Sequence, residues 1–253
     1  MIHKSKKIIA VVGPTASGKS DLAVEIALKT NGEIISADSR QVYKELDIGT
    51  GKITKKEMRG VPHFMLDIAS PKKRFNAAEY RKKAGKALSD ILARGNTPIL
   101  CGGTGFYISA LVEPSEFPDV PPNENLRKRL NRLAVEKLFA ELRKKDPERA
   151  SCIDPKNKRR IIRALEIVRA LGKVPKMTDA FTKKNDLSIL WIGTALDKKR
   201  LREKISIRLG RRLKEGMIAE TKRLHQKGLS WKRMEELGLE YKYLALFFAK
   251  EDV

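Results

Sequence analysis

The first part of the chain alternates short apolar runs with amphipathic segments, and glycine or polar residues close most of the runs. Residues 8–12, 33–36, 63–68 and 97–101 have the apolar composition of buried strands. Residues 20–30 and 76–94 carry apolar side chains at helical spacing. Strands that alternate with helices favour an α/β fold with a parallel sheet, whose ligands gather at the carboxyl ends of the strands.

A proline-rich segment, residues 113–123, precedes a region whose pattern is helical throughout, from 123 to 173, with Gly172 as the expected stop. Strand composition returns at 187–192. We therefore expect a core of residues 1–115 and 186–253 that contains a helical insertion at 116–185. The pattern of 198–233 indicates mostly one long basic helix, and the apolar tail after it has helical spacing.

The balance of charge changes this picture from a generic α/β enzyme to one with a polyanionic partner. The chain has 54 Lys and Arg against 31 Asp and Glu, a formal charge of +23. Nucleic acid is the partner that this favours, although ribosome association or solubility pressure also produces basic chains. Two cysteines far apart in sequence argue against disulfides and zinc–thiolate sites. Without a signal peptide or a long apolar stretch, we expect a cytoplasmic protein that does not enter a membrane.

The strongest motif is the segment GPTASGKS, which satisfies GxxxxGK[ST] between an expected strand and an expected helix. Such a loop binds at least two linked phosphates with backbone N–H groups and the helix N-terminus. Lys19 supplies a positive charge, and the Ser20 hydroxyl can bind Mg²⁺. The loop consists of Gly13, Pro14, Thr15, Ala16, Ser17, Gly18, Lys19 and Ser20. By itself it suggests ATP.

Several other polar residues can be interpreted in more than one way. Asp38 follows the second strand and could bind Mg²⁺, act as a base or cap a helix. Thr104 lies in GGTG after a later strand, either at the same crevice or in a simple turn. Arg159, Arg160 and Arg163 share a helix with apolar neighbours, which fits contact with a nucleic-acid backbone or a solvated helix face. The three histidines have no spaced partners and are interpreted as structural.

Five motifs in order then identify a family resemblance that covers almost the whole chain: GPTASGKS, ISADSRQVYKELDIGTGK, GVPHF, CGGTGFYI and NKRRIIRALEI. The chain resembles the tRNA dimethylallyltransferases. The resemblance implies a core like that of P-loop NTPases with an inserted, all-helical tRNA-binding domain. It implies transfer of a dimethylallyl group from dimethylallyl diphosphate to N6 of adenosine 37, in tRNAs that read codons starting with U. The partner would be the tRNA anticodon stem-loop, the cofactor Mg²⁺, and the enzyme a monomer.

The resemblance also implies roles for individual residues. Asp38 would be the general base, Thr15 and Lys19 would contact the diphosphate, Ser20 would serve Mg²⁺, and Arg208 would neutralise the leaving group. Contacts with tRNA would fall on Asp38, Ser39, Arg40, Gln41, Thr104 and Arg127, and on Arg159, Arg160, Ile161, Ile162 and Arg163.

The chain departs from the family pattern at DIGTGK and at Phe64, and the family's C-terminal segment does not follow Val253, so we expect a truncated C-terminus relative to the family. A P-loop small-molecule kinase is the alternative function. A nucleic-acid-binding module driven by nucleotide hydrolysis is a second one, and both would consume ATP.

Overall fold

The computed structural model describes residues 6–113, 118, 120–175 and 187–251. The chain divides into two compact units, which we call the core unit, residues 1–113 with 182–253, and the helical unit, residues 114–181. The division expected from the sequence falls within a few residues of this one. Each unit has its own hydrophobic core and is described by itself.

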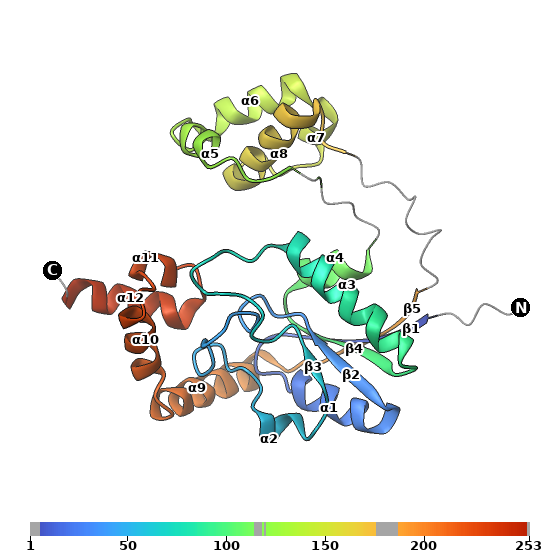
Figure 1. Cartoon of the computed structure of the whole chain (residues 1–253). Helices are drawn as coiled ribbons and strands as arrows, with labels where there is room; N and C mark the ends of the chain where they lie inside the picture. The colour runs from blue at the N-terminus through green and yellow to red at the C-terminus, as the bar shows by residue number, and fades with distance from the viewer. Residues whose placement is uncertain (1–5, 114–117, 119, 176–186, 252–253) are drawn as a thin grey trace, which may run out of the picture. The chain divides into compact units, whose positions relative to one another are not determined.

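A parallel sheet forms the centre of the core unit (Figure 1). Its strands lie in the order β3-β2-β4-β1-β5, and every neighbouring pair is parallel. The strands are β1 (Lys6–Val12), β2 (Gly32–Ser36), β3 (His63–Phe64), β4 (Thr97–Gly102) and β5 (Leu187–Gly193). Val12 pairs with Gly102 of β4 and with Gly193 of β5, so the loops after these three strands start side by side. The chain returns to this sheet at β5, after the helical unit.

Helices cover both faces of this sheet, as Figure 1 shows. Helix α1 (Lys19–Thr30) packs on one face, where Ala23 and Val24 join a buried cluster with Val11 and Ile99. Helices α3 (Ala77–Ala93) and α4 (Gly105–Val112) lie on the other face. Asn76 and Glu79 form a capping box that fixes the start of α3.

Contacts between aromatic rings and backbone join α3 and α4 to the sheet. The rings of Tyr80 and Tyr107 stack with their centroids 4.1 Å apart. The Tyr80 hydroxyl donates to the Ser36 carbonyl at the end of β2, which satisfies this polar group within the core.

Two expectations about element length were wrong. The strand expected at 63–68 stops after Phe64, because Met65 and Asp67 have positive φ angles of 69° and 55°, which no strand accommodates. The single helix expected over 198–233 is broken at Gly216 and Gly228, where φ is 101° and 85°. The segments are α9 (Lys198–Lys214), α10 (Met217–Gln226) and α11 (Trp231–Met234), and α12 (Leu239–Glu251) follows. The short helix α2 (Lys55–Met58) lies between β2 and β3.

Within residues 120–175 the helical unit contains α5 (Glu124–Asn131), α6 (Val135–Lys145), α7 (Pro147–Ser151) and α8 (Lys158–Leu171) rather than one continuous helical region. Gly172 ends α8 as expected. Leu130, Leu138, Leu142 and Leu165 are fully buried between these helices. The unit therefore has a core of its own. No helix in the described parts of either unit is long and apolar enough to cross a membrane.

Gly102 occupies a position where the sheet has no room for a side chain. A Cβ atom there would lie 2.3 Å from the backbone oxygen of Ala37, whereas a Cβ on Gly85 in α3 would meet nothing within 4 Å. We expect Gly102→Ala to lower the free energy of unfolding by about 1–3 kcal/mol, and Gly85→Ala to raise it by up to about 1 kcal/mol. Urea unfolding of both variants tests this. Equal midpoints for the two variants would contradict the packing described here.

Candidate active site

The segment 13–20 joins β1 to α1 at the carboxyl edge of the sheet, as expected, and we call it the phosphate loop. Gly18 adopts a left-handed conformation with φ of 84° and begins α1 without a side-chain cap. The first N–H groups of α1 therefore have no side-chain partner at the cap, and together with the helix dipole they favour an anion at this end.

Hydrogen bonds within the loop and to β5 hold its shape. The Ser17 hydroxyl donates to the Pro14 carbonyl at 2.8 Å and lies 2.6 Å from the hydroxyl of Thr194, which follows β5. A Cβ atom on Gly13 would lie 2.1 Å from the same Thr194 oxygen. Thr194 is thus a positioning residue that the motif does not include and that the sequence alone did not indicate.

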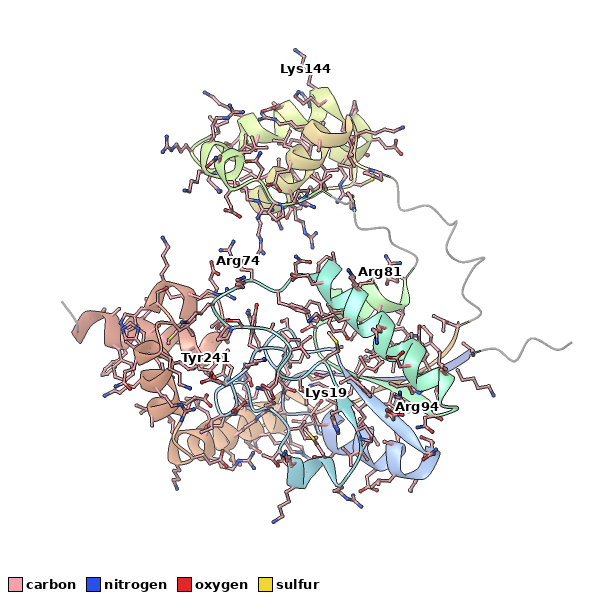
Figure 2. All side chains as sticks on the ribbon, viewed as in Figure 1. Lys19, Arg74, Arg81, Arg94, Lys144 and Tyr241 are labelled. Atoms are coloured by element: carbon pink, nitrogen blue, oxygen red, sulfur yellow. The ribbon has the colours of Figure 1, made fainter. Side chains whose placement is uncertain are left out.

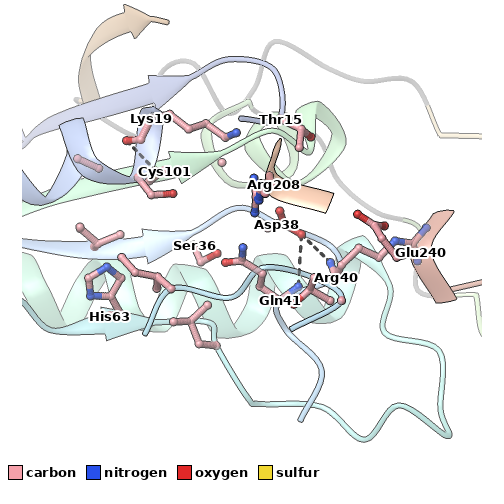
Figure 3. Close-up of a pocket in the computed structure, with 18 of the residues that line it drawn as sticks. Thr15, Lys19, Ser36, Asp38, Arg40, Gln41, His63, Cys101, Arg208 and Glu240 are labelled. Atoms are coloured by element: carbon pink, nitrogen blue, oxygen red, sulfur yellow. Dashed lines mark hydrogen bonds between the residues drawn. The ribbon is translucent and has the colours of Figure 1, made fainter. Parts of the chain in front are cut away.

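A pocket opens beside the phosphate loop (Figure 3). Of the expected site residues, it is lined by Thr15, Lys19, Ser20, Asp38, Arg40, Gln41 and Arg208. The structure therefore brings together residues from the phosphate loop, from the segment after β2 and from α9. Lys19, Asp38 and Arg208 extend into the same space in Figure 3. The basic groups around this space suit a ligand with several phosphate oxygens, and Asp38 adds a carboxylate beside them.

Burial lowers the pKa of two cationic groups that line the pocket, Lys19 and Arg208. The pKa of Lys19 lies below its usual value mainly because the ammonium is removed from water; the Asp38 charge opposes this change and Arg208 adds to it. The pKa of Arg208 is lowered by burial and then by the charge of Arg212. Lys19 now donates to the Pro14 carbonyl at 2.9 Å. An anionic ligand would reduce the repulsion between Lys19, Arg208 and Arg212, so the pocket favours a negatively charged ligand.

Asp38 both shapes the local backbone and reaches the pocket. One of its oxygens, Oδ1, accepts the N–H groups of Arg40 at 2.8 Å and Gln41 at 3.3 Å. These bonds shape a turn after β2, and no helix begins there, so the helix-capping alternative does not hold. Because both bonds go to the same oxygen, they orient the carboxylate without removing it from the pocket, and a role as a base remains compatible with them.

The segment after β4 is hydrogen-bonded to the segment that contains Asp38. The Thr104 hydroxyl accepts the N–H of Ser39 at 3.0 Å and donates to the Ser39 hydroxyl at 3.3 Å. The Thr104 N–H donates to the Ala37 carbonyl at 3.1 Å. Thr104 and Ser39 therefore contact each other next to Asp38, but neither of them lines the pocket.

The structure distinguishes Arg208 from two neighbouring arginines of α9. Arg208 and Arg212 both line the pocket, whereas Arg211 pairs with Glu215 on the exposed side of α9. Arg212 is 4% exposed and donates to Glu240 at 2.8 Å and to the Gly49 carbonyl at 3.1 Å. Sequence reasoning missed Arg212, although its spacing of one helical turn from Arg208 was a usable signal.

His63 also lines the pocket, so its interpretation as a structural residue was incomplete. Its Nδ1 donates to the Val61 carbonyl at 2.8 Å. Burial lowers the pKa of His63, while this bond opposes the change. His225 is structural as expected: its ring stacks on Trp231 with centroids 3.7 Å apart. His3 lies outside the described residues.

The helical unit corrects part of the expected RNA-contact set. Ile161 and Ile162 are 0% and 4% exposed in the core of the unit, so their side chains cannot reach RNA. Arg163 does not project freely, because it pairs with Glu166 and donates to the Val120 carbonyl at 2.8 Å. Arg127 grips the same buried Glu166 with two bonds of 2.8 Å.

Of the arginines expected to contact RNA in the helical unit, Arg159 and Arg160 remain exposed at the start of α8. Their guanidinium groups are the ones available to a partner.

A magnesium site made only of protein groups is not present in the described residues, since no cluster of three or more His, Cys, Asp or Glu could hold a metal ion. The pocket does fit a Mg²⁺ that arrives with a diphosphate. Mg²⁺ bound to phosphates usually keeps several waters and takes one or two protein oxygens. The Ser20 hydroxyl and the Asp38 carboxylate are among the oxygen groups that line the pocket and could serve as these ligands.

A glycine loop between β1 and α1, at the carboxyl edge of a parallel sheet and beside the half-buried Arg208 and the buried Arg212, is typical of a phosphate-binding protein with a P-loop-like core. The model of one protein family, IPP transferase, matches residues 41–252. The chain therefore belongs to the IPP transferase family.

Individual relatives agree with this assignment. The chain is 39% identical over 247 residues to the tRNA dimethylallyltransferase of Anoxybacillus flavithermus. This match covers 96% of this chain and 78% of the relative. The corresponding enzyme of Thermomicrobium roseum is 38% identical over 97% of this chain and 76% of the relative.

Solved structures give the same result. The full-length tRNA isopentenylpyrophosphate transferase of Bacillus halodurans is similar with a TM-score of 0.67 at 35% identity, covering 98% of this chain and 78% of that one. A eukaryotic dimethylallyltransferase acting on tRNA has a TM-score of 0.74 at 29% identity, over 91% of this chain and 60% of that one.

The phosphate loop makes a prediction that does not depend on the reaction. We expect Lys19→Met to weaken binding of inorganic diphosphate by about 10–100-fold, because a partly buried cation beside phosphate oxygens is lost. Lys29→Met, in the exposed last turn of α1, is the matched control and is expected to leave the affinity unchanged. Isothermal titration calorimetry measures both. Equal losses in the two variants would mean that only overall charge matters.

The lowered pKa of Lys19 adds a pH dependence. Because the protonated form binds the anion, diphosphate affinity should decline as the pH rises through the lowered pKa, beginning at a lower pH than for an ordinary lysine. Calorimetric titrations across the alkaline range test this. An affinity that stays constant until the usual pKa of lysine would contradict it.

Proposed function

We propose that this chain transfers a dimethylallyl group from dimethylallyl diphosphate to N6 of adenosine 37 in tRNAs that read codons starting with U, and releases diphosphate. The observation that carries the proposal is that one pocket contains a diphosphate cradle, a carboxylate and buried arginines in a chain of the IPP transferase family. The net charge of +23 supports a polyanionic second substrate.

The phosphate loop and two neighbouring cations would hold the leaving group. When the bond between the allylic carbon and the diphosphate oxygen breaks, positive charge develops on carbon and negative charge on oxygen. The N-terminus of α1, Lys19 and Arg208 are placed before the reaction, so they stabilise that negative charge without reorganising. Mg²⁺ held by Ser20 and the phosphates would neutralise further charge on the diphosphate.

Asp38 would accept the proton. The exocyclic amine of adenine is a weak nucleophile, and its proton becomes acidic only as the new C–N bond forms, so a carboxylate helps late in the reaction. The N–H groups of Arg40 and Gln41 hold the carboxylate through Oδ1. The proton passes to Asp38, the new N–C bond replaces the C–O bond, and diphosphate departs.

The target adenine must leave its stack to reach a pocket at the sheet edge, as with other enzymes that act on a base. Ser39, Arg40, Gln41 and Thr104 lie near Asp38 and would guide the base. Arg159 and Arg160 offer exposed cations to the RNA backbone. We expect a monomer to bind one anticodon stem-loop. The eukaryotic neighbour that acts on tRNA supports RNA as the acceptor.

The transfer assay decides between this function and a P-loop kinase. Dimethylallyl diphosphate labelled in the prenyl group is incubated with the protein and an anticodon stem-loop that carries adenosines at positions 36 and 37. Label in the RNA, without consumption of ATP, is the expected result. ATP hydrolysis or phosphoryl transfer without prenylation would support the kinase instead.

We expect Asp38→Asn to lower kcat by at least about 100-fold, because the base is lost. The amide oxygen can still accept the two N–H bonds that shape the segment, so the KM for RNA should change by less than about 3-fold. Steady-state kinetics with labelled donor measure both constants. Turnover close to that of the native enzyme would remove Asp38 from the base role.

The exposed arginines of α8 predict a salt effect. Replacing Arg159 and Arg160 by Ala should weaken stem-loop binding and reduce the slope of log K against log salt by about 1–2. Replacing Lys144, which Figure 2 labels, and Lys145, two exposed cations of α6, changes the net charge equally and serves as the control. Filter binding over a range of salt concentrations measures the slopes. Identical slopes for the two double variants would exclude a specific contact at α8.

A further inference from the structure

A short backbone segment holds several side chains of the pocket in place. The Gly51 carbonyl accepts from Arg208 at 3.3 Å and from the Gln41 amide at 3.1 Å. The Gly49 carbonyl accepts from Arg212 at 3.1 Å. We call residues 47–52 the carbonyl loop. The direction of two arginines of the pocket depends on where this loop lies.

A buried carboxylate in α10 anchors the other side of the carbonyl loop. Glu220 is 1% exposed. Its Oε2 accepts the N–H groups of Asp47 at 3.1 Å and Ile48 at 2.9 Å, and its Oε1 accepts the N–H of Gly49 at 3.0 Å and the hydroxyl of Tyr241 at 2.6 Å. Successive N–H groups turned to one point form an anion-binding concavity, and here a side chain of the same protein fills it.

The carbonyl loop fits tightly against α9 and α12. A Cβ atom on Gly49 would lie 2.5 Å from the ring of Tyr241. Gly51 has a φ of 58°, and a Cβ there would lie 1.8 Å from the guanidinium of Arg212 and 2.1 Å from that of Arg208. Because the loop packs this closely against Arg208 and Arg212, a shift of the loop at Glu220 would also shift the two guanidinium groups.

We propose that Glu220 is a positioning residue of the active site. It fixes three N–H groups of the carbonyl loop, and the carbonyls of the same loop direct Arg208 and Arg212 toward the leaving diphosphate. The catalytic consequence rests on the proposed function, whereas the effect on diphosphate binding does not. Glu220 does not line the pocket, so it acts on the arginines through the groups that it holds, chiefly the carbonyl loop.

The chemistry of the carboxylate explains why Gln is not an equal replacement. Glu220 accepts four hydrogen bonds, whereas an amide oxygen accepts two and its NH₂ group only donates. The Tyr241 oxygen could accept from that NH₂ group, but one backbone N–H of the loop would still lose its partner in a buried place. The loop would relax to find another acceptor, and its carbonyls would move with it.

The test compares Glu220→Gln with Tyr241→Phe. The second variant removes one hydrogen bond from the same carboxylate but leaves all three bonds to the loop, so it is the matched control. Binding of inorganic diphosphate is measured by calorimetry, and amide hydrogen exchange is followed at residues 47–49 and, as an internal reference, in α1. Glu220→Asp is included because it keeps the charge but reaches the loop less well.

We expect Glu220→Gln to weaken diphosphate binding by about 10-fold and to speed exchange at residues 47–49, with α1 unchanged. Tyr241→Phe should stay within about 2-fold of the native affinity, and Glu220→Asp should fall between. If Glu220→Gln does not fold, Glu220→Asp decides by the same measurements.

Unchanged diphosphate affinity despite faster exchange, or equal losses in Glu220→Gln and Tyr241→Phe, would overturn the positioning role and leave Glu220 as a structural residue. In the transfer assay, Glu220→Gln should lower kcat about 10-fold while the KM for RNA stays nearly constant. Failure of the native protein to label RNA would refute the proposed function but not the diphosphate result.

Discussion

β1 pairs with β4 on one side and with β5 on the other, and both ladders are parallel and in register at their carboxyl ends. Because of this pairing, the phosphate loop, the segment containing Thr104 and the segment containing Thr194 all begin at one edge of the sheet. The bond between Ser17 and Thr194, and the lack of space at Gly13, follow from that placement. β2, which pairs with β4, brings Asp38 to the same edge. The position of the site is therefore set by the order and register of the strands, and the phosphate loop alone does not determine it.

The pocket concentrates like charges at a cost in stability that a ligand can relieve. Lys19, Arg208 and Arg212 share one partly buried space, and burial lowers the pKa of all three. Carbonyl oxygens of Pro14, Gly49 and Gly51 and the carboxylate of Glu240 partly neutralise them. These protein groups already hold the three cations beside the pocket. The cations therefore need little rearrangement to meet an anionic ligand.

Local patterns predicted the strands, the phosphate loop and the insertion because each depends on a few neighbouring residues. The same patterns could not predict where Arg127 and Arg163 point, since both turn toward Glu166, which is buried by packing of α8 against α5 and α6. They also missed Arg212 and Glu220. Both residues contact a loop more than 160 positions away in the chain, and such pairings depend on tertiary structure alone. The helical spacing of apolar residues also did not predict the ends of the C-terminal helices. A glycine can lie within a helix or end one, and the positive φ angles of Gly216 and Gly228 show that the helices end there.

The insertion of the helical unit between α4 and β5 has a consequence for synthesis on the ribosome. Lys6 pairs with Leu187, so the edge of β1 that receives β5 stays open while the whole helical unit is made. The helical unit consists of contacts between near neighbours and can fold during that interval, whereas the core unit must wait for its last strand. An open strand edge attracts other chains. The order of the segments along this polypeptide therefore makes the nascent core unit, rather than the helical unit, the part in which aggregation competes with folding.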